Sequence, residues 1–269
     1  MSEPESIVPI TPKPYPGFAQ ALLVLLLYQL FSLLSVPGIV LGEHHHSQLG
    51  SWVFLAGQLG ATALALKVCL GMGGKPWAAA FPTRAVPAGV WPAVLVVTGG
   101  LVMLLNGIGN WVSHLIPPTP SFEHMFGTLG WPPIVLGAPI TEEPIFRGLI
   151  LGGFVQRYGI PKGILYGALL FGSFHMNPWQ LPTGIVLGLF LGWLVVHTSS
   201  LWPGVFGHLL NNLSAVLADK LGVRYLSDNH FQPFWMWTLG FALTGLGLWA
   251  LSRITSDMTA PDEEAMAAD

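Results

Sequence analysis

The sequence is poor in charge. Of its 269 residues, 9% are Asp, Glu, Lys or Arg, whereas 52% are hydrophobic. Soluble domains carry roughly 25% charged residues, so this chain lacks the side chains needed to cover a water-facing surface. The mean hydropathy of +0.61 agrees with that deficit. The composition excludes an ordinary soluble domain and indicates a multi-pass membrane protein.

Cysteine and basic residues are also scarce. The single cysteine, Cys69, excludes a disulfide within the chain and a zinc site built from several cysteines. A net charge of −3 provides no basic face for nucleic acid. Residues 1–16 lack the basic start and short apolar core of a cleaved signal peptide, so we expect a flexible tail. The acidic residues 256–269 are predicted to form a second tail.

Long apolar runs fill the rest of the chain. A helix needs about 20 apolar residues to cross a bilayer, and lipid favours helices because they satisfy their own backbone groups. We therefore predict an all-α membrane bundle of about eight transmembrane helices, folded as one domain over residues 17–255. The expected spans are 18–40, 50–70, 88–116, 133–156, 162–177, 181–198, 201–219 and 233–253.

The positions of Lys and Arg predict the orientation in the membrane. With the N-terminus inside, the inner segments hold seven of these residues and the outer loops hold two, Lys220 and Arg224. Arg147 lies within a span and is not counted. Because Lys and Arg accumulate on the cytoplasmic side, we predict a cell-membrane protein with both termini in the cytoplasm.

The stretch APITEEPIFRG, residues 138–148, concentrates charge inside the fourth span. Each ionised group there costs at least about 2.5–3.5 kcal/mol on insertion scales. Glu143 and Arg147 are four residues apart and can neutralise each other on one helix. Glu142 has no such local partner. Pro144 removes a backbone donor, which predicts either a bend there or a helix that starts near Thr141.

Two later spans carry uncommon polar residues. The run LLFGSFHMNP places Phe171 and His175 four residues apart, hence on one helical face. The run WPGVFGHLLNNLS places His208 and Asn212 in the same relation. Each feature alone is compatible with a structural role, such as an ion-pair clamp or an amide that ties helices together. Together, an unpaired carboxylate, two imidazoles and an amide are suited to general base catalysis and oxyanion support.

These motifs, EExxxR, FxxxH and HxxxN in that order, resemble the CPBP family of intramembrane proteases. The family includes the Rce1-type CAAX prenyl endopeptidases and the bacterial Abi proteins linked to bacteriocin immunity. The resemblance covers a core of about 133–218, and the first three spans and the last show no matching motif.

The resemblance implies a peptidase, with a role for each matching residue. Glu142 would activate water with the help of His175. His208 and Asn212 would stabilise the oxyanion. Glu143 and Arg147 would hold the site's shape or meet the substrate, and Phe171 would be a packing residue.

A metal site stays open at this point. If zinc binds, the ligands would be Glu142, His175 and His208, with water in the fourth position. A glutamate that ligates zinc is not free to act as the base, so we favour catalysis without a metal.

The substrate is not specified by the sequence. The predicted orientation places His175 near the outer end of its span, whereas CAAX endopeptidases act on cytosolic tails. We therefore predict a peptide or protein substrate within the bilayer and no prenylated one in particular. Two alternatives remain: an ion- or proton-coupled transporter, and a non-enzymatic peptide-binding immunity protein.

Overall fold

The computed structural model describes residues 14–45, 48–117, 130–227 and 231–267. Within these ranges the regular structure is helical, and an isolated bridge joins Thr83 to Ser200. The predicted all-α fold is confirmed. The elements are α1 (Phe18–Phe31), η1 (Ser32–Ser35), α2 (Val36–His45), α3 (Gln48–Met72), η2 (Trp77–Ala80), α4 (Val90–Leu115), η3 (Pro133–Gly137), α6 (Ala138–Glu143), η4 (Pro144–Ile150), α7 (Leu151–Tyr158), α8 (Ile160–Phe174), α9 (Gln180–Thr198), α10 (Trp202–Leu221), α11 (Arg224–Ser227) and α12 (Phe234–Ala267).

In the described part of the chain, five helical segments are long and apolar enough to cross a membrane. They are 18–43, 48–72, 90–115, 180–198 and 234–256, and the apolar helix α8 is shorter. Together with α8, the helical run 133–158 and α10, these segments make eight long helical segments, called rods below, close to the positions predicted from the sequence. The protein is therefore a helical membrane bundle. Helix α12 extends into the segment expected to be a tail, and the predicted domain bounds stay a prediction.

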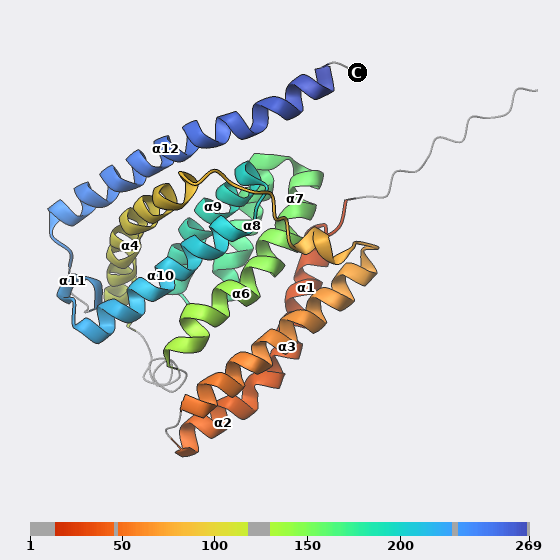
Figure 1. The fold of residues 1–269 in the computed structure, drawn as a ribbon. Coiled ribbons are helices and arrows are strands. Elements are labelled where there is room, and N and C mark those ends of the chain that lie inside the picture. The colour runs from red at the N-terminus through yellow and green to blue at the C-terminus, as the bar shows by residue number, and fades with distance from the viewer. Residues whose placement is uncertain (1–13, 46–47, 118–129, 228–230, 268–269) are drawn as a thin grey trace, which may run out of the picture.

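The rods alternate in direction, so the start of α1 and the end of α12 lie toward the same end of the bundle (Figure 1). Helix α12 packs along α4, α8 packs on α9, and α10 lies against both α4 and α9. Helices α1, α2 and α3 form an N-terminal hairpin beside α6 (Figure 1). Large apolar side chains are exposed on the outer faces of the bundle, as lipid contact requires. Examples are Leu26, Leu30, Phe241 and Trp249.

The core lies around η4, the segment that carries the charged stretch. Its seven residues are all buried, and they contact α3, α7, α8 and α9. The largest fully buried side chains include Phe146, Phe154 and Phe171. The Glu143–Arg147 pair is thus held near the centre of an apolar bundle.

Candidate active site

The charged stretch belongs to a continuous helical run from Pro133 to Tyr158. Its turns are π-helical over Pro133–Gly137 and again over Pro144–Ile150. A helix start near Thr141 was therefore a wrong expectation, because the helix is already formed at Pro133. Proline lacks the N–H that an α-helical turn would use, and π-helical turns are frequent at functional sites.

Glu143 is the centre of a sealed ionic cluster. Its carboxylate is 0% exposed and lies 3.0 Å from Nη1 of Arg147, as the four-residue spacing predicted. The same oxygen, Oε1, lies 2.8 Å from Nδ1 of His208 on α10, a contact that the sequence did not predict. Gly204 precedes His208 by one turn, and a Cβ there would sit 3.3 Å from Oε2 of Glu143. A small residue at 204 therefore lets α10 approach the carboxylate.

The contact with Glu143 fixes the orientation of His208. An ionised carboxylate only accepts hydrogen bonds, so Nδ1–H of His208 is the donor. The ring's other nitrogen, Nε2, remains as the chemically available atom. A histidine whose second nitrogen is bound to a carboxylate has a defined tautomer and ring orientation.

Phe171 on α8 joins this cluster to the second histidine. The Arg147 guanidinium carbon lies 4.1 Å from the centre of the Phe171 ring. The rings of His208 and His175 meet Phe171 edge to face, with centroids at 5.7 Å and 5.2 Å. Phe171 is buried, as expected of a packing residue. Side chains from η4, α8 and α10 thus converge on one aromatic ring.

His175 lies at the C-terminal end of α8, near the end of its span as predicted. Its Nδ1 is 3.0 Å from the carbonyl oxygen of Phe171. A carbonyl oxygen cannot donate, so His175 also holds its proton on Nδ1 and has Nε2 available. The side chain is half-buried, in contrast to the buried His208.

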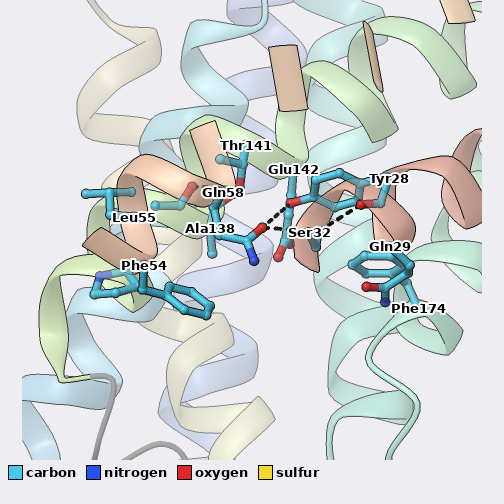
Figure 2. Close-up of a pocket in the computed structure, with 12 residues that line it drawn as sticks. Tyr28, Gln29, Ser32, Phe54, Leu55, Gln58, Ala138, Thr141, Glu142 and Phe174 are labelled. Atoms are coloured by element: carbon cyan, nitrogen blue, oxygen red, sulfur yellow. Dashed lines mark hydrogen bonds between the residues drawn. The ribbon is translucent and has the colours of Figure 1, made fainter. Parts of the chain in front are cut away.

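Glu142 lies outside the sealed cluster and lines a cavity of about 180 Å³ (Figure 2). Its Oε2 is buried and has no hydrogen-bond partner among the described residues. Glu142 is within electrostatic range of Tyr28 and of Arg147. Phe174 also lines the cavity and lies one residue before His175. The lining residues are Tyr28, Gln29, Ser32, Phe54, Leu55, Gln58, Pro133, Gly137, Ala138, Thr141, Glu142 and Phe174.

The opposite wall of this cavity was missed by the sequence-based predictions. Figure 2 shows Tyr28, Ser32 and Gln58 of the N-terminal hairpin among the residues that line the cavity together with Glu142 and Thr141 of α6. The available signal was a polar residue inside an otherwise apolar run, as in LLLYQLFS and FLAGQLGA. No spacing rule connects those runs to the fourth span, so their partner could not be read from the sequence.

Asn212 connects α10 to the start of the charged run. Its Nδ2 donates to the carbonyl oxygen of Ile134 at 2.9 Å, and its Oδ1 accepts from Nδ2 of Asn211 at 3.1 Å. One of its two amide protons is used by Ile134, which leaves one for another acceptor. The oxyanion role implied by the resemblance stays a prediction.

The zinc alternative does not fit these positions. In the part of the chain that the structure describes, no three or more His, Cys, Asp or Glu side chains are grouped closely enough to share a metal ion. The bond from Nδ1 of His208 to Glu143 leaves Nε2 as the nitrogen open to a ligand, so the position of the side chains and not this bond decides the question. We therefore derive no step through a metal.

The fold and these side chains define a class of protein: a polytopic membrane protein whose buried carboxylates and imidazoles lie among its spans. Residues 124–214 match the family described as type II CAAX prenyl endopeptidase Rce1-like. This match confirms the resemblance to CPBP family proteases, and it contains all the motif residues from Glu142 to Asn212.

A curated relative gives the same indication. The chain is 30% identical over 95 residues to the protein named "Putative membrane peptidase YdiL" of Bacillus subtilis (strain 168). The aligned part covers 35% of this chain and 39% of that protein. No solved structure matches the chain at a significant level.

Proposed function

We propose that the protein is an intramembrane endopeptidase of the CPBP type, with Glu142 as the general base. The observation that carries the proposal is the contrast between two adjacent glutamates. Glu143 is paired with Arg147 and His208 through Oε1 and does not line the cavity, although its Oε2 is also buried without a hydrogen-bond partner in the described structure. Glu142 lines the cavity and has neither of these basic side chains in contact. A carboxylate of this kind is placed to accept a proton from water. The matched family segment supports peptide hydrolysis as the reaction.

The proposed reaction adds water across a peptide bond. Glu142 takes a proton from water as the water oxygen bonds to the carbonyl carbon, and the carbonyl oxygen becomes an oxyanion. When the C=O bond re-forms, the C–N bond breaks. Glu142 then gives its proton to the leaving nitrogen, which yields a carboxylic acid and an amine and restores the carboxylate.

The imidazoles and the amide have supporting parts in this proposal. His175 does not line the cavity but follows Phe174, which does, and in the proposal its available Nε2 helps to hold the attacking water. Asn212 stabilises the oxyanion with its second amide proton. His208 does so in its doubly protonated form, in which Nε2–H donates to the oxyanion while Nδ1–H stays on Glu143. Donors fixed before the reaction stabilise developing charge effectively because they need no rearrangement. Arg147 and Glu143 hold this framework in place.

The setting of the reaction is proposed from the sequence. The substrate is a peptide or protein segment that reaches the cavity from within the membrane, and no nucleic acid takes part. Both chain ends lie in the cytoplasm, on the basis of the distribution of Lys and Arg. No metal cofactor is required for the proposed steps.

The test compares peptide termini in living cells. Cells that produce the wild-type protein, Glu142→Gln or the control Glu43→Gln are analysed by terminus-selective mass spectrometry. Glu43 is an exposed acid on α2, so its change is chemically matched but remote from the site. New termini should appear with the wild type and the control and disappear with Glu142→Gln. Identical termini in all three would overturn the proposal.

A further inference from the structure

The N-terminal hairpin, defined here as residues 18–72, lies outside the segment that matches the family. It nevertheless supplies half of the residues around the Glu142 cavity: Tyr28, Gln29, Ser32, Phe54, Leu55 and Gln58. The matched segment therefore forms one wall of the cavity, and the hairpin forms the other. The question is what the polar side chains of this second wall do.

These side chains form a hydrogen-bonded array around Gln58. Its Oε1 accepts from the hydroxyl of Tyr28 at 3.2 Å. The hydroxyl of Ser32 lies 3.4 Å from the same oxygen but has a closer acceptor, the carbonyl oxygen of Tyr28 at 2.8 Å. Its Nε2 donates one proton to Oγ of Ser35 at 3.0 Å. An amide group has two such protons, so the second remains for an acceptor. The Gln58 amide therefore retains donor capacity beside the cavity.

The hairpin is also held by close backbone contact, because a Cβ at Gly57 would lie 2.6 Å from the carbonyl oxygen of Leu34. Polar groups within membrane spans are costly and usually functional. Tyr28 also stacks on Phe174, with ring centroids 5.6 Å apart, which fixes the array against the helix that carries His175.

The cavity suits a short length of polypeptide. Polar groups of the array and of Thr141 and Glu142 line one part, and Phe54, Leu55, Pro133, Ala138 and Phe174 line the rest. An extended peptide presents carbonyl oxygens, which accept hydrogen bonds, and side chains that can meet an apolar surface. The remaining proton of Gln58 matches a backbone carbonyl, and Glu142 lines the same cavity as the array (Figure 2).

We propose that Gln58 and Tyr28 are substrate-positioning residues: Gln58 donates a hydrogen bond to a backbone carbonyl of the peptide, and Tyr28 holds the Gln58 amide in the orientation for it. This inference rests on the proposed peptidase function. It extends the site beyond the matched family segment to the first two spans.

The test is kinetic and uses purified protein in lipid nanodiscs. The probe is a quenched-fluorescence peptide that spans the bond identified by the terminus comparison. Gln58→Leu removes the amide that donates to the peptide. Tyr28→Phe removes the hydroxyl that holds this amide but keeps the aromatic ring stacked on Phe174. The matched controls are Gln156→Leu on α7 and Tyr166→Phe on α8, neither of which lines the cavity.

Loss of one ground-state hydrogen bond should raise KM about 10-fold for Gln58→Leu while kcat changes by less than about 3-fold. Tyr28→Phe should raise KM by a smaller factor, about 3-fold. Both controls should retain wild-type values. A KM in both variants equal to that of the controls would overturn the inference, as would a loss of kcat with no change in KM.

A binding measurement separates this inference from the proposed function. Affinity for the same peptide is compared between Glu142→Gln and the double variant Glu142→Gln/Gln58→Leu, in which cleavage is blocked. The double variant should bind about 10-fold more weakly. If Glu142→Gln still cleaves, the proposed function fails. If Glu142→Gln is inactive and both proteins bind equally well, only the inference about the hairpin fails.

Discussion

Glu142 and Glu143 are neighbours in the chain, yet they belong to two different regions of the molecule. Glu143 lies in a sealed cluster with Arg147, His208 and the face of Phe171. Glu142 lies on the wall of a cavity, with a buried oxygen that has no hydrogen-bond partner in the described part of the chain. Glu143 is therefore paired with two basic side chains, whereas Glu142 is the carboxylate that we propose acts on water. Adjacent identical residues can thus have separate roles because helical geometry points them about 100° apart.

The largest expected effect is on the rate of cleavage and tests the proposed role of Glu142 as the general base. Glu142→Gln keeps the size of the side chain but cannot accept a proton from water, so kcat should fall about 10³-fold. The measurement is steady-state cleavage of the quenched peptide in nanodiscs, together with thermal unfolding. The unfolding temperature should stay close to that of the wild type. If Glu142→Gln still cleaves the peptide, the general base must be another residue.

The next effect concerns the sealed cluster and is one of stability. Glu143→Gln leaves the Arg147 charge buried without a counter-charge, which should lower the free energy of unfolding by about 3–5 kcal/mol. Chemical unfolding in detergent micelles measures the change. The double variant Glu143→Leu/Arg147→Met removes both charges and should recover most of the loss. If the double variant is as unstable as Glu143→Gln, an uncompensated charge is not the cause.

A smaller effect is expected at the ring that joins the two histidines. Phe171→Leu removes the aromatic face beneath Arg147, a contact worth about 2 kcal/mol when it is desolvated. Phe154→Leu is the matched control, since Phe154 is equally buried but its ring contacts are with Phe18, Tyr158 and Tyr166. Unfolding measurements should show Phe171→Leu to be the less stable of the two variants. If both variants lose the same amount of stability, the cation–π contact does not contribute measurably to the stability of the cluster.

The smallest effect is expected from metal removal. Because the donor atoms of Glu142, His175 and His208 are not grouped for a shared ion, treatment with 1,10-phenanthroline should leave cleavage within about 2-fold of the untreated rate. Metal analysis of the purified protein accompanies the assay. Activity that is lost on chelation and restored by Zn²⁺ would show that the donors regroup around a metal.

Much of the fold was predictable, since the apolar runs fixed the number and approximate limits of the eight rods. Local geometry also predicted the Glu143–Arg147 pair, because a four-residue spacing on a helix brings side chains together. The helix start near Thr141 was wrong, because Pro144 is accommodated in a π-helical turn of a helix that is already formed. The order of the motifs predicted the family resemblance that the comparison confirmed.

Contacts between rods were not predictable in the same way. The bond between His208 and Glu143 spans 65 residues, and the cavity joins Gln58 to Glu142 across 84. Which face of one helix meets which face of another depends on how all the rods rotate and pack. The spacing of residues along one rod does not contain that information.

The sequence by itself determined that this is a helical membrane protein with a charged stretch held inside it, because composition and periodicity act along one chain segment at a time. Only the tertiary structure decided that His208 joins the Glu143–Arg147 pair, that Glu142 lines a cavity, and that the first two spans close that cavity. The physical reason is that burial and partners are properties of the packed bundle, and they arise only when distant helices meet.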